Sequence, residues 1–192
     1  MIDSTNRGKG ENLMEAEMQR LVKKAIKGNK KAFEKLVQHH YERIYRTAYL
    51  YVYNEADALD VVQEASYQAY KSINTLKNPE YFTTWLTRIV IRCSGQVIKK
   101  KNNVILLSDE ILTNVPDETN SNIEESVQLL HAVQQLRLNY RTAITLFYYY
   151  DYSIKTISHV MEVPENTVKT YLSRGKAELK KIYKSEEDKC HG

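Results

Sequence analysis

Apolar residues recur every three or four positions over most of this chain, and this period is the feature that most limits its fold. From Ala16 to about Lys101 the spacing is almost uninterrupted. Steps of three and four place apolar side chains on one face of an α-helix. Six glycines and three prolines occur among 192 residues, whereas an all-β protein needs many tight turns. The pattern therefore predicts an all-α fold.

Breaks in this period divide the chain into segments. Short polar stretches interrupt it at 27–32, 54–57 and 74–81. A longer polar and acidic stretch, "NNVILLSDEILTNVPDETNSN" at 102–122, contains one of the prolines, and we interpret it as a linker. We expect two small helical domains, at 16–102 and 123–184, joined by an acidic flexible linker at 103–122. We expect residues 1–15 and 185–192 to be disordered tails.

The charges follow the same division. Residues 1–101 carry 18 Lys and Arg against 11 Asp and Glu, a balance of +7, and residues 137–184 carry nine against four, a balance of +5. Residues 102–136 carry six acids and no Lys or Arg. Two basic blocks around an acidic one are compatible with a polyanionic partner, although many soluble helices also have basic faces.

The remaining composition argues against several classes of protein. No apolar run approaches the roughly 20 residues of a membrane span, and the polar start lacks the apolar core of a signal peptide. We therefore expect a cytoplasmic protein. Cys93 and Cys190 suggest neither a disulfide framework nor a zinc site. The pair Cys190–His191 could bind a metal, but we expect an irregular tail there instead.

A helix-turn-helix pattern lies near the C-terminus. A short helix from Ile154 to Met161, with Ser153 as a plausible N-cap, is followed by a turn and by "VPENTVKTYLSRGKAELKK" at 163–181. On the second helix, one face carries the apolar residues and glycine, and the opposite face carries small residues flanked by cations. The apolar face comprises Val168, Leu172, Gly175, Leu179 and Ile182.

Small side chains on an exposed helix face suit DNA binding. They let the helix approach base edges in the major groove, while longer cations at the sides reach phosphates. The helix start can also meet phosphate with backbone N–H groups. The candidate DNA-binding residues are Asn166, Thr167, Lys169, Thr170, Ser173, Arg174 and Lys176. The alternative is an ordinary solvated basic helix in a bundle.

An acidic helix face interrupts the N-terminal basic block. In "DALDVVQEASYQAY" at 57–70, inward positions are apolar, and Asp60, Gln63 and Glu64 decorate the outer side. Such a face repels phosphate and suits a protein partner that presents Arg or Lys. The alternative is a solvated face without a partner.

A second N-terminal stretch combines aromatic and basic residues. In "YFTTWLTRIVIRCSGQVIKKK" at 81–101, cations and amides share one side of the predicted helix, and aromatic residues lie near its start. Stacking and positive charge together hold exposed bases of single-stranded nucleic acid. The candidates are Lys77 in the preceding loop, Tyr81, Trp85, Arg88, Arg92, Gln96, Lys99 and Lys100. Trp85 could instead belong to the core, and we expect it to be partly buried in either case.

These segments, taken in order, resemble the sigma factors of bacterial RNA polymerase, and most closely their two-domain extracytoplasmic-function type. The resemblance covers about residues 16–184 and rests on "AFEKLVQHHYERIYRTAY", "DALDVVQEASYQAY", "FTTWLTRIVIR" and "ISHVMEVPENTVKTYLSRGKAELKK". The second segment is the most specific match. The chain departs from the family pattern at several positions, with Leu59 in place of an acid, Ser66 in place of an aromatic residue, Arg92 in place of Asn, Gln96 where Asp or Asn is common, and Lys155 and Thr156 before Ile157.

The resemblance implies roles for the candidate surfaces. Asp60, Gln63 and Glu64 would dock on the clamp helices of the polymerase large subunit, and the flap of the same enzyme would be a second contact. The helix from Trp85 to Lys101 would hold the −10 promoter element, and the helix from Asn166 to Lys181 would read the −35 element. The linker would lead toward the RNA path of the polymerase. An anti-sigma factor, often membrane-anchored in this family, would hold the protein inactive.

Two other classes of function remain to be weighed. The first is a helix-turn-helix regulator that acts without polymerase and uses the N-terminal domain as a ligand sensor. The second is an enzyme, but the candidate bases His39, His40, His131 and His159 have no paired nucleophile, and no phosphate-binding loop or metal-ligand spacing occurs in the sequence. We expect no catalytic residues, no cofactor, no metal and no small-molecule substrate.

Overall fold

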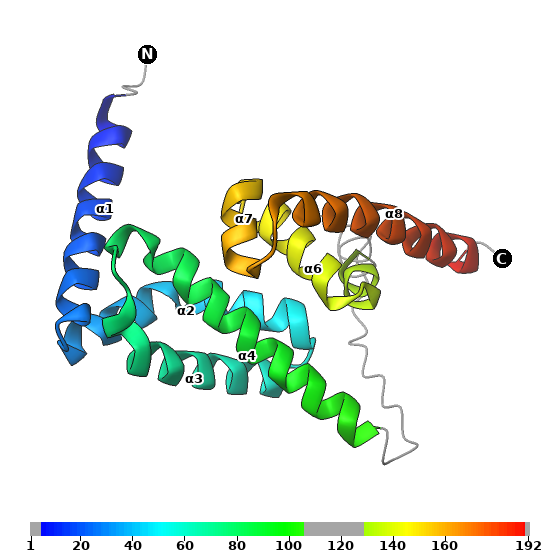
Figure 1. Cartoon of the computed structure of the whole chain (residues 1–192), viewed down its shortest axis with the longest axis horizontal. Helices are drawn as coiled ribbons and strands as arrows, with labels where there is room; N and C mark the ends of the chain where they lie inside the picture. Colours follow the sequence, from blue (N-terminus) through cyan, green and yellow to red (C-terminus); the bar gives the residue numbers. More distant parts are fainter. Residues whose placement is uncertain (1–4, 106–128, 191–192) are drawn as a thin grey trace. The chain divides into compact units, whose positions relative to one another are not determined.

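The chain is built from helices. The computed structural model describes the backbone of residues 5–105 and 129–190, and the side chains of residues 14–101 and 129–183. Every regular element in these ranges is helical, which confirms the predicted all-α fold (Figure 1). The described ranges contain no helix that is long and apolar enough to span a membrane.

The helices fall into an N-terminal and a C-terminal series. The first comprises α1 (Thr5–Ile26), α2 (Lys30–Val52), α3 (Glu55–Ser72), the short 3-10 helices η1 (Ile73–Thr75) and η2 (Pro79–Tyr81), and α4 (Phe82–Ile105). The second begins with helical backbone over 129–135 and continues with α6 (Leu138–Ile144), the π-helical turn η3 (Thr145–Tyr149), α7 (Ile154–Met161) and α8 (Glu165–Cys190).

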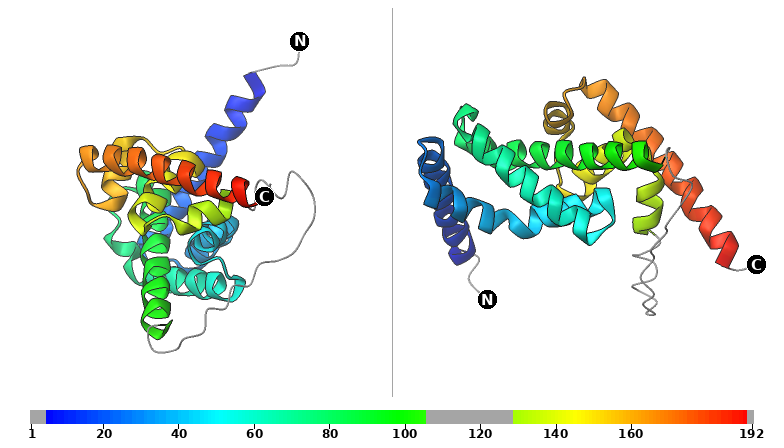
Figure 2. Two further views of the ribbon diagram at one scale, coloured as in Figure 1. Left: turned by 90° about the vertical axis from the view of Figure 1, so that its right-hand side faces the viewer. Right: turned by 90° about the horizontal axis from the view of Figure 1, so that it is seen from below.

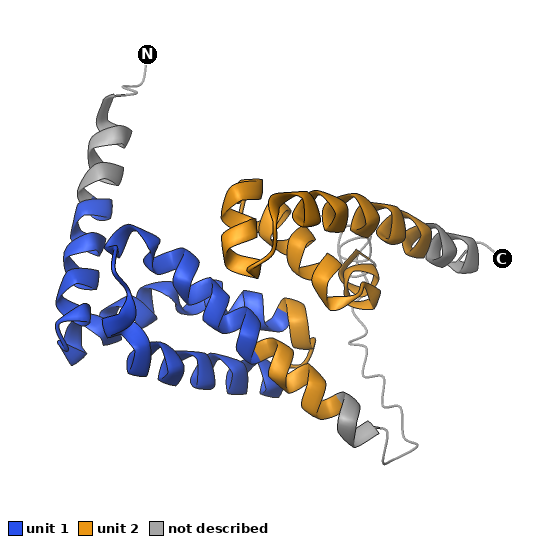
Figure 3. Cartoon of the chain, in the orientation of Figure 1, with its two compact units in different colours: residues 1–49, 55–93 blue, residues 50–54, 94–192 orange. Residues whose placement is uncertain are grey.

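Contacts between Cα atoms divide the chain into two compact units (Figure 3). Unit 1 comprises Met1–Tyr49 and Glu55–Cys93, and unit 2 comprises Leu50–Asn54 and Ser94–Gly192. The domain limits expected from the sequence stay predictions. Helix α1 begins at Thr5, α4 ends at Ile105 and α8 runs to Cys190, so these helices extend into segments for which we expected tails and a linker. The rest of the expected linker lies outside the described residues.

Unit 1 has an apolar core to which α1, α2, α3 and α4 all contribute. The core includes Val22 of α1, Leu36 of α2, Val61 and Ala65 of α3, and Leu86 of α4, all nearly inaccessible to solvent. These positions repeat at helical spacing in each segment, so burial of one face holds each helix in place.

The turn between α1 and α2 depends on Gly28. Its φ of 87° lies in the left-handed region, which a residue without a Cβ atom adopts without steric cost. The Gly28 amide donates to the carbonyl oxygen of Ala25 over 2.9 Å. Asn29 then caps α2, because its Oδ1 atom accepts a hydrogen bond of 2.9 Å from the Ala32 amide. These two residues end one helix and start the next.

The helix-turn-helix lies in unit 2, where α7 and α8 are joined by a short turn that can be followed in Figure 2. The predicted N-cap is confirmed, because the Ser153 hydroxyl accepts from the Thr156 amide over 3.1 Å. Glu162 ends α7 with a φ of 55°, and the Ser158 hydroxyl donates to the Val163 carbonyl oxygen over 2.6 Å. Local hydrogen bonds therefore fix the turn that orients α8.

Candidate nucleic-acid and polymerase interfaces

Helix α8 has the two faces that its sequence predicts. Val168, Leu172 and Gly175 are buried. The opposite side is exposed and carries most of the candidate DNA-binding residues: Asn166, Lys169, Thr170, Ser173 and Arg174, with Thr167 half-buried beside them. The small hydroxyl residues thus lie between longer cations on the solvent side of one helix.

Gly175 explains how α8 comes so close to α6. A Cβ atom at this position would lie 3.2 Å from Ile144 Cγ1 and 3.2 Å from Tyr140 Cβ. These distances are tighter than ordinary carbon contacts, so glycine suits the contact. The rings of Tyr140 and Tyr171 also pack with their centroids 5.7 Å apart. Close packing on this side keeps the other face of α8 turned to solvent.

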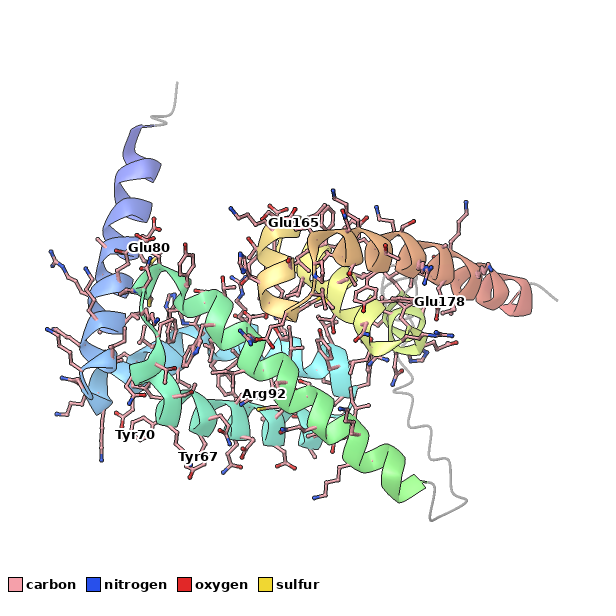
Figure 4. The ribbon with its side chains drawn as sticks, in the orientation of Figure 1. Tyr67, Tyr70, Glu80, Arg92, Glu165 and Glu178 are labelled. Carbon is pink, nitrogen blue, oxygen red and sulfur yellow. The ribbon has the colours of Figure 1, made fainter. Side chains whose placement is uncertain are left out.

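The first turn of α8 carries an acid and an amide that is already engaged, and both disfavour a phosphate at the backbone here. Glu165 and Asn166 begin the helix, and the Thr167 amide is engaged by the Pro164 carbonyl oxygen over 2.9 Å. The Thr170 hydroxyl donates to the Asn166 carbonyl oxygen over 2.9 Å, which leaves its methyl group and its oxygen lone pairs for a ligand. Glu165, labelled in Figure 4, is an acid in this first turn that would repel phosphate.

Lys176 is set apart from the other candidates on α8. Its Nζ atom lies 5.5 Å from the centroid of the Tyr148 ring and 6.0 Å from that of Phe147, at cation–π distance. Six residues separate it from Thr170, which turns it roughly 120° around the helix. The structure therefore places Lys176 on the flank of α8 that meets η3, beside the row of small residues and not within it.

Helix α4 carries its candidate residues along one exposed stripe. Arg88, Arg92 and Lys99 succeed one another at steps of four and seven residues and are exposed, as are Gln96 and Lys100. Arg92 is labelled in Figure 4. Lys77 is exposed in the loop before the helix. The stripe is a row of positive charge on a rigid element, which is the electrostatic requirement for holding a phosphate backbone.

Aromatic residues lie at the start of this stripe. Tyr81 is 61% exposed, and Trp85 is half-buried as expected, with its ring centroid 5.9 Å from that of Phe82. Asn78 orders the preceding turn, because its Oδ1 atom accepts from the Glu80 amide over 3.1 Å and Pro79 follows it. An anchored Trp85 ring and an exposed Tyr81 ring suit stacking on bases.

Helix α3 presents the acidic face. Asp60, Gln63 and Glu64 are exposed, while the neighbouring Val61, Val62 and Ala65 are buried. The Gln68 amide group donates to Glu64 Oε1 over 2.7 Å, which orders the carboxylate on the surface. The structure therefore brings the three predicted polymerase-binding residues together on one side of one helix.

The same helix exposes apolar side chains that sequence reasoning did not single out. Leu59 is 44% exposed and Tyr67 is 54% exposed, and they flank Gln63 by one helical turn on either side. Tyr70 is 41% exposed, and its ring centroid lies 5.3 Å from that of Phe33 in an edge-on contact. Large apolar groups that remain exposed beside polar ones are typical of protein-binding surfaces. The sequence could have indicated this surface, because Leu59 and Tyr67 fall outside the row of apolar residues that α3 buries.

His40 is one of the histidines weighed as candidate bases. The described residues contain no group of three His, Cys, Asp or Glu side chains that could hold a metal. His40 is buried, with Nδ1 2.9 Å from the Leu36 carbonyl oxygen and Nε2 3.4 Å from Thr83 Oγ1. Burial lowers the pKa of His40, and the charges of His39 and Arg43 act in the same direction, while the bond to Leu36 opposes them. His40 is therefore a packing residue whose ring nitrogens lie near partners inside the protein.

Comparisons with known proteins identify the family. Residues 36–103 match the model of Sigma-70 region 2, and residues 126–179 match that of Sigma-70, region 4. The RNA polymerase sigma factor SigV of Bacillus subtilis is 31% identical over 149 residues, which cover 78% of this chain and 89% of SigV. The chain belongs to the extracytoplasmic-function sigma factors. It is a transcription initiation factor of the sigma-70 family, and the alternative of a polymerase-independent regulator is not favoured.

Other relatives agree with this assignment. The sigma factor is 29% identical over 182 residues to the ECF RNA polymerase sigma factor SigW of Bacillus subtilis, with 88% of this chain and 97% of SigW covered. Its fold resembles CnrH in complex with the cytosolic domain of CnrY, with a TM-score of 0.66 and 20% identity over 88% of this chain and 97% of CnrH. It also resembles RpoE in complex with the anti-sigma factor NepR from Bartonella quintana, with a TM-score of 0.67 and 17% identity over 80% and 98% of the two chains.

The matched regions contain all the candidate surfaces of this sigma factor. The acidic face of α3 and the stripe of α4 lie within region 2, and the exposed face of α8 lies within region 4. The two sets of contacts that the sequence predicts for a promoter therefore lie in the two different matched regions.

Proposed function

We propose that this sigma factor binds core RNA polymerase through the acidic face of α3. The observation that carries the proposal is the exposure of Asp60, Gln63 and Glu64 on one side of a helix whose other side is fully buried. A carboxylate-rich face beside apolar Leu59 and Tyr67 suits a helix that presents Arg or Lys together with apolar residues. The clamp helices of the polymerase large subunit are the proposed partner, and the flap is a second contact.

We also assign the two DNA contacts to α4 and α8. The stripe of α4 would hold the melted −10 element, with Tyr81 and Trp85 stacking on bases and the cations of the stripe contacting phosphates. The exposed face of α8 would read the −35 element in duplex form, with Thr170 and Ser173 near base edges and Arg174 at the backbone. Lys176, which lies at the edge of this surface over the rings of Phe147 and Tyr148, would contact a neighbouring phosphate and no base.

Control by a protein partner and residence in the cytoplasm complete the proposal. Two structural relatives were each solved with a second protein bound, and in one of them that protein is an anti-sigma factor. We propose that an anti-sigma factor also binds this chain and covers surfaces needed for promoter binding. We propose that the protein acts in the cytoplasm, because RNA polymerase and promoter DNA are found there in bacteria.

Co-elution with purified core RNA polymerase tests the proposal. The intact protein should co-elute at moderate salt, and Asp60→Arg with Glu64→Arg should abolish co-elution, because the reversed charges would meet the cations of the partner. The matched control is Glu17→Arg with Glu34→Arg, which changes the net charge equally at exposed acids of α1 and α2. Loss with the first pair alone supports the assignment of α3. No co-elution of the intact protein would refute the polymerase-binding function.

A further inference from the structure

Most of the excess positive charge of the N-terminal helices lies where α1 turns into α2. Residues 20–35 carry seven Lys and Arg against one acid, Glu34, a balance of +6, while residues 1–101 as a whole have a balance of +7. These cations are exposed, and neither the acidic face of α3 nor the stripe of α4 includes them. We call the following residues the basic corner: Arg20, Lys23, Lys24, Lys27, Lys30, Lys31 and Lys35.

The fold gathers these cations on the solvent side of one turn. Gly28 and Asn29 bring the end of α1 and the start of α2 together at one corner of unit 1 (Figure 1). On α1, Val22 and Ala25 are each 1% exposed, so they fix the side that faces the core. At about 100° per residue, the four cations of residues 20–27 lie on the opposite side. They supply at least one positive charge per helical turn of about 5 Å, a row that can follow a phosphate backbone.

The charge of the basic corner is not neutralised by ion pairs. Among the described side chains, no carboxylate forms an ion pair with any of its cations. Glu34, the acid of this segment, is exposed next to Lys35. Six of the seven cations are lysines, whose compact ammonium groups bind phosphate as point charges and lack the rigid fork with which arginine recognises planar groups. Such a surface attracts a polyanion without reading its sequence.

The apolar sides of the two helices argue against a lipid surface as the partner. A helix that binds a membrane inserts apolar side chains among the lipids and keeps its cations at the headgroups. Here Val22 and Ala25 of α1, and Phe33 and Leu36 of α2, are buried in the core of unit 1. Residues 20–35, all of which the structure describes, expose no large apolar side chain. The basic corner therefore suits a nucleic acid, which charge alone can hold.

Helix α1 adjoins the surface that we assign to the −10 element. It packs against η1 and η2, and Ile73 and Leu76 of this segment are buried. The same segment carries Lys77 and Tyr81, which are exposed candidates for −10 contacts. DNA held by these two residues would therefore lie next to α1.

We propose that the basic corner binds phosphates of promoter DNA beside the −10 element and so extends the DNA-binding surface of unit 1 beyond α4. The inference rests on the proposed function of α4. Each lysine that meets a phosphate releases a condensed cation from the DNA, so the basic corner adds affinity that falls as salt rises. It adds no base preference, because phosphates carry no sequence information.

Removal of charge from α1 tests the proposal. A triple variant with Lys23→Gln, Lys24→Gln and Lys27→Gln keeps residues of good helix propensity. Holoenzyme, formed from core RNA polymerase and this protein, is titrated with a labelled duplex that the holoenzyme selects as a promoter from randomised DNA. The slope of log K against log salt should become shallower by about two, because each phosphate contact contributes roughly 0.7 to 0.9. The ratio of affinities for this duplex and for one with an altered −10 sequence should stay the same.

Two further proteins separate local charge from net charge and from damage to the fold. Glu34→Gln removes the acid of the segment, so it should tighten binding by about twofold at low salt, an effect that a damaged helix would not give. The matched control for the triple variant removes three exposed cations elsewhere and should leave the slope unchanged: Arg46→Gln, Lys71→Gln and Arg137→Gln.

The contrary results distinguish this inference from the proposed function. If holoenzyme with the unaltered protein binds the promoter but the triple variant keeps the same salt slope, the basic corner alone is refuted. An equal change of slope in the control would refute it as well. If holoenzyme with the unaltered protein binds no promoter, the proposed function fails and the basic corner with it.

Two other partners would be revealed by the same triple variant. Loss of its co-elution with core RNA polymerase would assign the basic corner to the polymerase and overturn the DNA contact. Binding of the free protein to vesicles of phosphatidylcholine and phosphatidylglycerol, lost in the triple variant while the DNA salt slope stays unchanged, would assign the basic corner to a lipid surface instead.

Discussion

The guanidinium of Arg141 donates a hydrogen bond of 3.0 Å to the carbonyl oxygen of Tyr51. Arg141→Met should therefore destabilise the protein by about 3 kcal/mol, because hydrogen bonds from a charged donor are lost and buried carbonyl groups stay unsatisfied. Urea denaturation followed by circular dichroism measures the change. Arg137→Met is the matched control, since Arg137 is exposed and lies four residues away. Equal stability of the two variants would show that the hydrogen bonds of the buried Arg141 side chain contribute nothing to the free energy of unfolding.

Arg174 lies exposed beside Ser173 on the side of α8 that we propose to face DNA. Arg174→Ala should weaken binding of polymerase holoenzyme to promoter DNA and lower the slope of log K against log salt by about one, because one fewer phosphate is neutralised. Binding titrations over a range of salt concentrations measure this slope. Arg137→Ala should leave it unchanged. An unaltered slope with Arg174→Ala would remove this residue from the interface.

Trp85 is the single tryptophan of the chain and is half-buried against Phe82. Stacking of a base on its exposed part should change its fluorescence when a single strand carrying the −10 sequence binds to the holoenzyme that contains this protein. The polymerase has tryptophans of its own, so the Trp85→Phe protein supplies the background to subtract. The same signal with both proteins would assign Trp85 to the core.

His40 links stability to pH. Burial lowers its pKa from the ordinary value of 6.5, so the unfolded chain takes up a proton more readily than the folded protein. Stability should therefore be fully present above pH 6.5 and should fall as the pH drops from 6.5 toward the lower pKa of the folded state. Urea denaturation at a series of pH values should give a shallower fall for His40→Gln than for the unaltered protein. If stability fell equally with pH in both proteins, titratable groups other than His40 would cause the loss of stability.

Several features of the fold could be predicted because their causes are local. The period of three and four residues fixes helical faces, and Ser153 caps α7 by a bond to an amide three residues away. The acidic face of α3 and the small-residue face of α8 also follow from spacing along one helix. Tyr70 lies 41% exposed beside this face, as a tyrosine can when its ring packs and its polar tip faces solvent.

The sequence by itself determined the helical class, the helix-turn-helix and the candidate faces of α3, α4 and α8, because each depends on residues within a few turns of one another. The tertiary structure alone decided that Arg141 is buried at the end of α2 and that Lys176 lies over the rings of Phe147 and Tyr148. It also decided that Leu138 meets Gly95. These contacts join residues that are 28 or more positions apart, and no local period encodes which distant surface a side chain will meet.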